Sequence, residues 1–455
     1  MKRSVGRLLA VAAMVIIGTA DAARGDGQDK AGTVLMGLPA APAFIPLGQL
    51  PGSSSGSRAT RISPDGQVII GTAISPQGTQ AFRWTPGGGM VGLGDLPGGA
   101  FQSVATGMST NGSVVVGWST SANGAQEAFR WRNGIGMEGL GDLPGGEFNS
   151  AAAAVSANGA TVVGWGATAD AGIEAFRWSL LDGLHSLGDL PGGIVNSRAL
   201  GISGDGSLIV GWGNSGVSEA FTWSVTAGMV GLGFVPDALL DGSQAFDVSF
   251  DGETIVGNAW APLGVQAMRY TEQDGMSALG DLPGGNPQPF SFAFGVSADG
   301  STIVGRGDTD DGTRAFIWDA GNGLRNLQEV LEIDFGLKDM AGWTLVEARG
   351  ADIYGLNIVG WGEYNGIQEA WLVRLPNPCP ADLDHNGLTG IEDMLVLLGI
   401  FGPCADCMNC AGDLDSDCEI GVTDLLALFA AWGPCPPEIS CQSSVRLITG
   451  PPAAS

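Results

Sequence analysis

Histidine, tyrosine and positive charge are scarce in this chain of 455 residues. It contains two histidines, His185 and His385, three tyrosines, and 20 Lys and Arg against 47 Asp and Glu. Two histidines are too few for a multi-histidine metal centre, and they weaken the case for a Ser-His-Asp hydrolase. The formal net charge of -27 would repel phosphate backbones and anionic membranes, so we expect no nucleic-acid partner.

Glycine, by contrast, is abundant. It accounts for 76 of the 455 residues, more than twice its usual share of about 7%. Hydrophobic residues make up 44% of the chain, which is enough to bury large cores. The composition excludes an ordinary helical enzyme and favours repetitive β-structure with many turns.

The N-terminal residues predict an export signal. Lys2, Arg3 and Arg7 precede an apolar run over 8–17, and small residues follow at Ala20 and Ala22, the positions that a signal peptidase inspects. A membrane anchor needs about 20 apolar residues, more than this run contains, and no second run follows. We therefore expect a signal peptide over 1–22, a linker over 23–42 and a mature protein, secreted or attached to a bacterial cell surface, without a membrane span.

Three short motifs recur along the body of the chain with a period of about 47 residues. The string LGDLPGG begins at residues 93, 140, 187 and 279, with altered copies beginning at 47, 232 and 327. Ala-Phe-Arg-Trp or a variant ends at residues 84, 131, 178, 223, 270 and 318, and Trp371 belongs to a seventh copy. Ser-x-Asp-Gly or Ser-x-Asn-Gly covers 63–66, 109–112, 156–159, 203–206, 249–252 and 297–300, and the seventh copy lacks it. Such a fixed period indicates one supersecondary unit per repeat.

Each repeat predicts four short strands. Asp-Gly and Asn-Gly between apolar runs indicate hairpins, because a two-residue turn needs the positive φ that these residues tolerate. A second strand such as 114–118, a third such as 127–131 and a fourth such as 136–143 follow, and Pro-Gly-Gly then turns the chain. Four strands in about 47 residues match one blade of a propeller.

The two ends of the repeat array complement each other. The last copy, 343–375, has three strand candidates, whereas 43–50 is a lone fourth-strand sequence before the first full unit. Pairing them would close a ring and leave no free sheet edge between the first and last blades. We therefore predict an all-β, seven-bladed β-propeller over 43–376. The alternative, an open β-solenoid, does not explain why the missing strand stands at the other end.

The body resembles a family of bacterial extracellular repeats named HAF, for a His-Ala-Phe triplet. The resemblance covers about 330 residues and rests on strings such as 127–129 and 174–176 (both Glu-Ala-Phe), with VSxDGxxVVG and LGDLPGG segments around them. The histidine of the triplet is absent from every copy, so no role of that residue is transferred here. The resemblance implies export and a β-repeat fold rather than any known reaction.

Recurring tryptophans and aspartates have both a functional and a structural interpretation. The tryptophans of the third strands could stack on sugar rings, and the aspartates of the LGDLPGG strings could ring a pore or bind cations. These residues are Trp84, Trp131, Trp178, Trp223 and Trp318, and Asp95, Asp142, Asp189 and Asp281. A residue that recurs once per blade more often packs or turns the blades, and no pair of catalytic carboxylates stands out. We therefore predict no catalytic residues.

The composition changes at Pro376 and indicates a separate acidic module over 377–441. All seven cysteines lie at or after Cys379, and one arginine faces 11 Asp and Glu. Two 12-residue loops, 382–393 and 413–424, place oxygen ligands at positions 1, 3, 5 and 12 and a backbone carbonyl at position 7, a pattern that specifies Ca²⁺. The predicted ligands are Asp382, Asp384, Asn386, Leu388 and Asp393 in the first loop, and Asp413, Asp415, Asp417, Glu419 and Asp424 in the second. Gly387 occupies position 6 of the first loop, but Cys418 does so in the second, at a cost of roughly 1–2 kcal/mol if that residue is left-handed.

Each loop leads into an apolar helix, expected over 392–401 and 423–432 and ended by Gly-Pro. A duplicated calcium loop followed, but not preceded, by a helix resembles type I dockerin modules, here in a cysteine-containing variant. The resemblance covers about 60 residues and implies that Ca²⁺ folds this segment and that it docks onto a cohesin-like partner or surface receptor. Dockerins contact partners partly through loop positions 10 and 11, here 391–392 and 422–423. The Ser/Thr pairs of well-known dockerins are missing at these positions, which leaves the partner open, and we expect a disordered tail over 442–455.

The cysteines of this module are arranged symmetrically. Cys379 and Cys410 each lie three residues before a loop, and Cys404 and Cys435 each lie eleven residues after its last ligand. The spacing of Cys404, Cys407 and Cys410 also allows zinc, but an exported chain favours disulfides. Two or three bridges would stabilise a module too small for a large core, and the odd number leaves one thiol free or paired with another molecule.

These patterns predict a secreted, non-catalytic propeller carried by a calcium-binding, dockerin-like module. The alternative is a propeller that binds or degrades polysaccharide, as an O-glycosyl hydrolase or lyase, since dockerins usually accompany polysaccharide degradation. A pocket on one face of the ring with two carboxylates about 5–10 Å apart would favour that alternative.

Overall fold

The computed structural model describes residues 42–53, 56–169, 172–284, 288–338, 340–377, 379–383, 388–404, 410, 412–415 and 417–434. The expected signal peptide, the expected linker up to residue 41 and the expected tail lie outside the described residues. No helix within the described ranges is long and apolar enough to cross a membrane.

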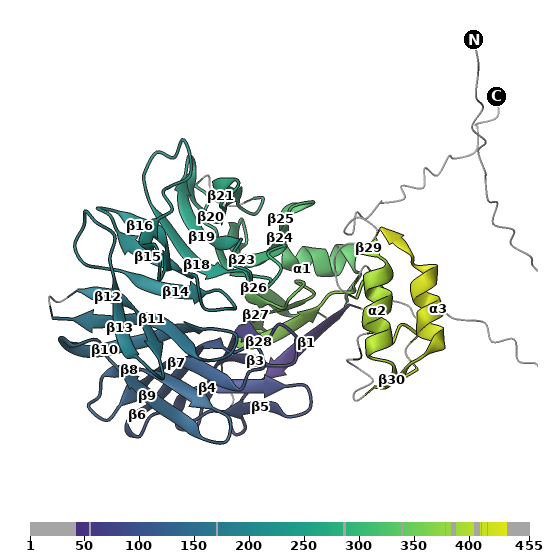
Figure 1. Ribbon diagram of the computed structural model, residues 1–455, viewed down its shortest axis with the longest axis horizontal. Helices are drawn as coiled ribbons and strands as arrows, with labels where there is room; N and C mark the ends of the chain where they lie inside the picture. The colour runs from purple at the N-terminus through teal and green to yellow at the C-terminus, as the bar shows by residue number, and fades with distance from the viewer. Residues whose placement is uncertain are drawn as a thin grey trace, which may run out of the picture.

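Most of the described chain forms short antiparallel strands in groups of four (Figure 1). A single parallel bridge between Thr79 and Gln102 joins the first two groups, sheets 1 and 2. Sheets 1 and 2 are β2 (Ser57–Ile62), β3 (Ile69–Ser75), β4 (Gly78–Thr85), β5 (Gly89–Gly92) and β6 (Gly98–Met108), β7 (Val114–Ser121), β8 (Gln126–Arg132), β9 (Gly136–Gly141). Sheets 3 and 4 are β10 (Gly145–Val155), β11 (Thr161–Thr168), β12 (Ile173–Ser179), β13 (Gly183–Gly188) and β14 (Arg198–Ile202), β15 (Ile209–Asn214), β16 (Ser218–Ser224), β17 (Gly228–Gly231). Sheets 5 and 6 are β18 (Ser243–Val248), β19 (Ile255–Ala261), β20 (Gly264–Thr271), β21 (Gly275–Gly280) and β22 (Phe292–Val296), β23 (Thr302–Thr309), β24 (Gly312–Asp319), β25 (Gly323–Asn326). Sheet 7 is β26 (Trp343–Ala351), β27 (Asn357–Tyr364), β28 (Ile367–Arg374) and β1 (Ala43–Gly48).

Sheet 7 combines strands from the two ends of the repeat array. The N-terminal strand β1 pairs antiparallel with β28, with Ala43 opposite Arg374 and Ile45 opposite Leu372. The first strand of each sheet contacts the first strand of the next, from β2 through β6, β10, β14, β18 and β22 to β26, and β26 contacts β2. A Cβ on Gly350 of β26 would lie 3.3 Å from the Cα of Arg61 of β2, so these two backbones pack closely. The sheets therefore form a β-propeller-like ring, whereas an open solenoid would keep β2 and β26 apart.

The recurring motifs supply the core between neighbouring sheets. The third-strand aromatics Phe82, Phe129, Phe176, Phe221 and Phe316 are fully buried, as are Met268 and Trp371 at the equivalent positions. The glycine of the second strand leaves room for the first strand: a Cβ on Gly211 would lie 1.9 Å from the carbonyl oxygen of Arg198. The tryptophans at the end of the third strand pack partly buried against the same cores, as Trp178 and Trp223 do. These contacts give the motifs a packing role.

Buried serines join neighbouring sheets, a feature that the sequence analysis missed. Ser197, at the start of the first strand of sheet 4, donates its Oγ hydrogen to the carbonyl of Gly188 at 2.6 Å and accepts the N–H of Ala175 at 2.9 Å, both in sheet 3. Ser57, Ser103, Ser150, Ser243 and Ser291 make the same pair of bonds to the preceding sheet. The signal was present in the sequence, because these six serines follow one another at intervals of 46 to 48 residues.

The Ser-x-Asp-Gly turns differ in detail from the expected two-residue hairpins. In the first, Ser63 pairs its backbone with Val68, and its Oγ accepts the N–H of Val68 at 2.8 Å, so four residues lie between the paired positions. Only the glycine of each such turn takes a positive φ, as Gly66 does, because a longer turn needs one left-handed residue instead of two. The seventh copy keeps the turn, although its sequence lacks the motif. Asp352 takes the place of the serine and accepts the N–H of Leu356 at 2.8 Å.

The altered copy at residue 327 does not form the expected turn. Leu327–Glu329 forms a short helix, α1, which continues as one π-turn, η1 (Val330–Asp334). Asn326 caps α1 by accepting the N–H of Gln328 at 3.0 Å, and this copy has no Pro-Gly-Gly to turn the chain. Leu327 and Leu331 are fully buried between sheets 6 and 7. Apolar packing therefore replaces the serine bridge at this one junction.

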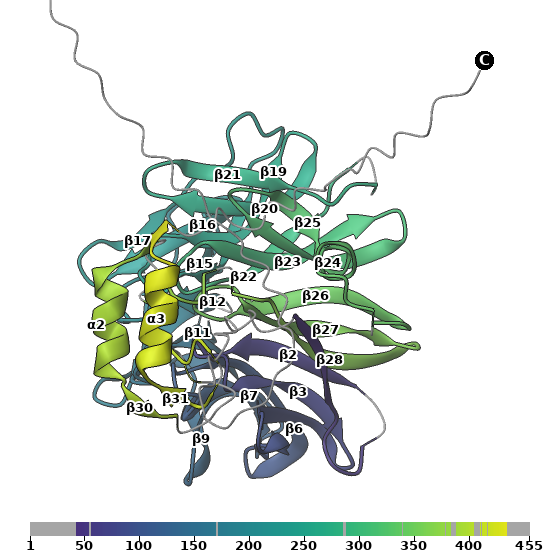
Figure 2. The same ribbon diagram turned by 90° about the vertical axis from the view of Figure 1, so that its right-hand side faces the viewer.

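The C-terminal module is built from two similar halves. Its helices, α2 (Ile391–Gly399) and α3 (Val422–Ala430), lie side by side (Figures 1 and 2). Both helices begin one residue earlier and end two residues earlier than expected. Short strands of one half pair with the other half: β29 (Leu388–Thr389) pairs with β32 (Gly433–Pro434), and β31 (Glu419–Ile420) pairs with β30 (Gly402–Pro403). The Gly-Pro pairs thus follow the helices, as expected, and also join the two halves.

Candidate metal-binding and docking module

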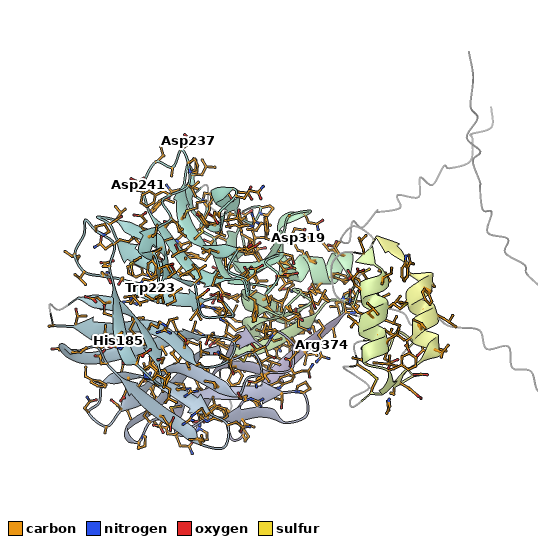
Figure 3. The ribbon with its side chains drawn as sticks, in the orientation of Figure 1. His185, Trp223, Asp237, Asp241, Asp319 and Arg374 are labelled. Carbon is orange, nitrogen blue, oxygen red and sulfur yellow. A yellow bond between two sulfur atoms is a disulfide. The ribbon has the colours of Figure 1, made fainter. Side chains whose placement is uncertain are left out.

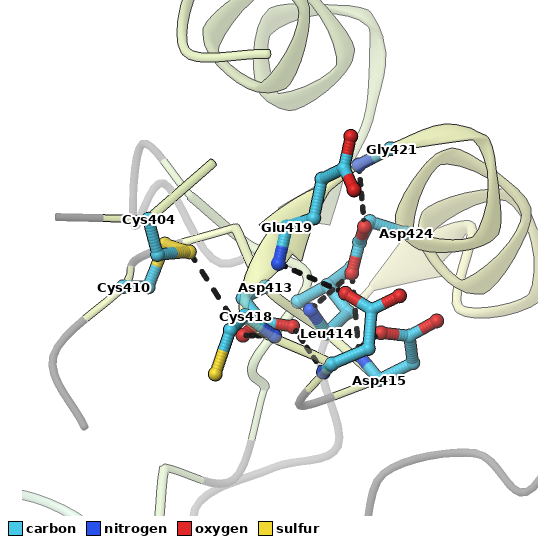
Figure 4. Close-up of a disulfide and its surroundings, with 10 residues drawn as sticks. Cys404, Cys410, Asp413, Leu414, Asp415, Cys418, Glu419, Gly421 and Asp424 are labelled. Atoms are coloured by element: carbon cyan, nitrogen blue, oxygen red, sulfur yellow. Dashed lines mark hydrogen bonds between the residues drawn. A yellow bond between two sulfur atoms is a disulfide. The ribbon is translucent and has the colours of Figure 1, made fainter. Parts of the chain in front are cut away.

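Three of the predicted ligands meet in the second loop. Carboxylate oxygens of Asp413, Asp415 and Asp424 all lie within 4.8 Å of one another (Figure 4). Asp413 and Asp415 come from the start of the loop, whereas Asp424 lies in the first turn of α3. The fold therefore brings positions 1, 3 and 12 of the calcium pattern together.

Asp424 is fully buried, and its two oxygens hold the loop against the helix. One oxygen accepts the N–H of Leu414 at 2.6 Å, and the other accepts the N–H of Gly421, the N-cap of α3, at 2.7 Å. Asp393 is also fully buried and does the same in the first loop, accepting from Leu383 at 2.6 Å and from Gly390 at 2.6 Å. A carboxylate at this helical position is favourable because it pairs with exposed N–H groups at the helix start.

Position 6 of the second loop is left-handed, as its place in the calcium pattern requires. Cys418 has a φ of 72°, and its N–H donates to Oδ2 of Asp413 at 2.9 Å. Asp417 accepts the N–H of Glu419 at 2.9 Å instead of joining the three clustered carboxylates. The predicted role of Glu419, a backbone carbonyl ligand, involves no side-chain contact, and this residue begins β31.

The first loop is described only in part. Asp382 is buried and Leu388 begins β29, but the predicted ligands Asp384 and Asn386 lie outside the described residues, as does His385. The buried Asp393 occupies the same place against α2 that Asp424 occupies against α3. Position 12 is therefore equivalent in the two halves.

Disulfides account for the described cysteines. Cys404 and Cys410 form a disulfide beside Asp413, with a Cα–Cα distance of 5.8 Å (Figure 4). Cys379 and Cys418 are also disulfide-bonded. Because the bridge occupies both sulfurs, Cys404 and Cys410 cannot bind zinc, and of the two hypotheses for them the disulfide is correct.

The donor set of the second loop fits a hard cation. Its oxygens are carboxylates, which Ca²⁺ prefers, and the sequence from residue 377 to 445 contains no lysine or arginine to neutralise them. Asp413, Asp415 and the fully buried Asp424 bring three like charges together, an arrangement that a divalent cation stabilises. If Ca²⁺ binds, these three residues would hold it.

The helices of this module expose apolar side chains in two matching rows. The row on α2 continues past its end, and the row on α3 repeats it 31 residues later. The pairs are Ile391 and Val422, Leu395 and Leu426, Leu398 and Phe429, and Phe401 and Trp432, all exposed. Leu395 and Leu426, in the middle of the rows, are 61% and 55% exposed. Exposed apolar residues gathered in this way are typical of a surface that contacts another protein.

The recurring aspartates of the repeats hold loops. Asp189 accepts the N–H groups of Leu190, Asn196 and Asn214 at 2.7–2.9 Å. Asp281 does the same with three N–H groups, and burial raises its pKa despite these bonds. These contacts favour the structural interpretation of the repeated aspartates over a cation site.

His185 is the one histidine within the described ranges. It is exposed on β13, on the side of the ring away from α2 and α3, and its Nε2 lies 2.8 Å from the carbonyl oxygen of Asp182 (Figure 3).

The fold and the module thus define a β-propeller-like protein with a small, disulfide-bonded helical module. No family model and no curated protein matches the chain. Among solved structures it is similar to TolB from Acinetobacter baumannii, with a TM-score of 0.42 and 11% identity over 58% of this chain. The chain spans 63% of the length of that structure. It is also similar to a proposed TolB from Agrobacterium tumefaciens, with a TM-score of 0.35 and 14% identity over 71% of this chain and 92% of that one.

Proposed function

We propose that the chain is a secreted, non-catalytic, HAF-type seven-bladed β-propeller attached through a dockerin-like module over 377–441. The module folds around two Ca²⁺ ions and docks onto a cohesin-like protein or cell-surface receptor. The propeller then presents a recognition surface. The observation that carries the proposal is the repetition, in both halves of the module, of a buried loop carboxylate and an exposed apolar row.

The calcium part of the proposal is supported by Asp393 and Asp424. Each is fully buried at the start of a helix and accepts backbone N–H groups from its own loop, so each couples the loop to the helix. A cation bound in the loop would therefore stabilise the helix that follows and, with it, the apolar row on that helix. Calcium binding and docking are coupled in this way.

The docking part is supported by the two apolar rows. A partner would cover these side chains, since apolar side chains form the buried core of protein–protein interfaces. Within the described residues the pairing of β29 with β32 and of β31 with β30 fixes the two helices relative to each other. The two rows are therefore held in a fixed relation to each other.

Calorimetric titration of the full chain with Ca²⁺ tests the first part. Two sites are expected, and Asp424→Ala and Asp393→Ala should each remove one. Asp415→Asn, which keeps the size of the side chain and is not fully buried, should weaken one site without unfolding the module. Asp274→Ala, at an exposed carboxylate of the propeller, is the matched control and should change nothing. No calcium binding by the wild-type chain would refute the proposal.

Biolayer interferometry against a cohesin-like domain encoded in the same genome tests the second part. Binding is expected in Ca²⁺ and not in EDTA. The double change Leu395→Asp and Leu426→Asp should abolish binding while both calcium sites remain, because these side chains are exposed and neither is a predicted ligand. Binding that persists in the double variant would show that the rows are not the docking surface.

A further inference from the structure

A cavity of about 430 Å³ lies among the first strands of sheets 1, 2 and 7. Arg58 and Thr60 of β2, Thr72 of β3 and Thr106 of β6 line one part of it, and Arg349 of β26 and Trp361 of β27 line another. Its volume lies within the range of about 300–1,000 Å³ that is usual for small-molecule sites. The cavity exists only because β26 and β27 pack beside β2, so it depends on closure of the ring.

This cavity, hereafter the arginine cavity, is cationic in a chain whose net charge is -27. Among the described residues its lining includes two arginines and no carboxylate. Two other cavities hold more carboxylates than arginines: one has Asp247 and Asp352 against Arg61, and the other has four carboxylates, including Glu329 and Glu332, against one arginine. Of these three cavities, the arginine cavity is therefore the one where an anionic ligand would meet the least repulsion.

Both arginines of the cavity have donors to spare. Arg58 is exposed, its guanidinium carbon lies 4.7 Å from the centre of the Trp361 ring, and no described carboxylate lies within ion-pair distance of it. Arg349 pairs with Glu347 through Nε. This leaves the two Nη atoms of Arg349, the edge that binds carboxylate or sulfate in a bidentate manner.

The surroundings of Arg349 also hold an excess of positive charge. Glu347 is shared with Arg306, whose Nη1 lies 3.3 Å from Oε2, so one carboxylate faces two guanidinium groups. Burial lowers the pKa of Arg349; Glu347 opposes this shift, and the positive charges of Arg61 and Arg306 add to it. Arg61 is itself paired with Asp247 at 2.6 Å, so three arginines face two carboxylates here. A further negative charge beside Arg349 would therefore relieve repulsion between the arginines.

We propose that the arginine cavity binds a saccharide carrying a carboxylate or sulfate group. Arg58 and the Nη atoms of Arg349 bind the anionic group, and the hydroxyls of Thr60 and Thr72 bind the sugar. The hydroxyl of Thr106 already donates to the carbonyl of Ala152 at 2.9 Å. Arginine forks select the acidic group, whereas threonine hydroxyls match the many hydroxyls of a sugar ring. This inference rests on the proposed function in one respect, the closed ring, and it adds the ligand class that the propeller recognises.

Calorimetric titration of the full chain tests the proposal with four probes: trigalacturonate, a sulfated trisaccharide, an uncharged trisaccharide and sodium sulfate. At least one acidic trisaccharide is expected to bind, and at least tenfold more tightly than the uncharged one. Comparison of the two acidic probes identifies the anionic group. Equal binding of the uncharged sugar, or no binding of either acidic sugar, would overturn the proposal. Sulfate that binds as tightly as the sugars would overturn the saccharide assignment.

Arg58→Gln is the variant of choice, because this side chain is exposed and its loss should not unfold the ring. This variant should bind the acidic trisaccharide at least tenfold more weakly than the wild type does. The matched control is Arg132→Gln, at an arginine that pairs with Glu138 at 2.7 Å on sheet 2. Equal affinities in the two variants would place the ligand elsewhere and overturn the proposal.

The calcium variant Asp424→Ala separates this inference from the proposed function. It should lose a calcium site and keep saccharide affinity, since the two sites lie in different parts of the chain. Loss of saccharide binding by Arg58→Gln with both calcium sites intact would support the arginine cavity alone. Absence of saccharide binding in a wild-type chain that still binds Ca²⁺ overturns only the cavity.

Discussion

The buried serines that bridge the sheets lead to a quantitative prediction about ring closure. Ser197→Ala removes a fully buried hydroxyl and leaves the carbonyl of Gly188 and the N–H of Ala175 without their partner. Each buried polar group left unsatisfied costs about 1–3 kcal/mol, so the variant should lose about 2–6 kcal/mol of the free energy of unfolding. Ser277→Ala, at an exposed serine, should stay within about 0.5 kcal/mol of the wild type.

Ser57→Ala applies the same change at the junction of sheet 7 with sheet 1. Ser57 donates to the carbonyl of Gly48 in β1 at 2.7 Å and accepts the N–H of Ala370 in β28 at 3.0 Å, and it is 1% exposed. In a closed ring this site is equivalent to the interior junctions. The two variants should therefore lose similar amounts of stability.

Denaturant unfolding followed by tryptophan fluorescence measures these differences, and hydrogen exchange of the β28 peptide locates them. A shift of the midpoint without a change in slope indicates a change in stability alone. If Ser57→Ala behaves like Ser277→Ala while Ser197→Ala is destabilised, the ring is not closed through β1. If neither variant differs from the control, the hydroxyl bridges do not stabilise the sheets and the reasoning fails.

Three further predictions concern the propeller and the module. Gly211→Ala should destabilise the fold by about 3 kcal/mol or more, because its Cβ would lie 1.9 Å from the Arg198 carbonyl, whereas Gly87→Ala, with open space around it, should be neutral in thermal unfolding. Burial raises the pKa of Asp352 above its ordinary value of 3.8. A raised pKa stabilises the fold at pH values below 3.8, and this stabilisation is lost as the pH rises through the pKa of the folded state. The melting temperature of Asp352→Ser should therefore rise relative to that of the wild type between pH 4 and pH 7. A difference in melting temperature that does not change with pH would contradict this assignment. Chelation of calcium should remove about 2.7 kcal/mol from the module if the free ion stood at 100 times its Kd, while the main calorimetric transition of the propeller stays in place.

Local patterns predicted much of this structure. The hairpin signals located the strands, and the lone strand sequence at residues 43–50 correctly predicted the pairing of β1 with β28. The spacing of acidic residues also predicted that Asp413, Asp415 and Asp424 would meet, since a 12-residue loop brings its first and last positions together. These features depend on neighbours in the sequence or on a fixed repeat.

Features that depend on distant partners were not predicted. The role of Ser197 requires knowing that its hydroxyl reaches the preceding sheet, and a small polar residue at a strand start has no local signature for this. Gly402 and Gly433 end helices locally, but across the module they pair with Ile420 and Thr389, which lie 18 and 44 positions away. Arg58 and Arg349 stand 291 positions apart in the sequence and meet only through ring closure.

The pairing of β1 with β28 also determines how the molecule would respond to force. Ala43 lies opposite Arg374, so the chain enters and leaves sheet 7 at the same end of an antiparallel pair. A pull between the N-terminal segment and the C-terminal module would open this pair one hydrogen bond at a time. Force can also act between a ligand on the propeller and a partner on the module. It would then be transmitted through β28, which is hydrogen-bonded to β27 on one side and to β1 on the other. Strand order thus makes the ring weak to tension between its termini and strong to tension along its attachment.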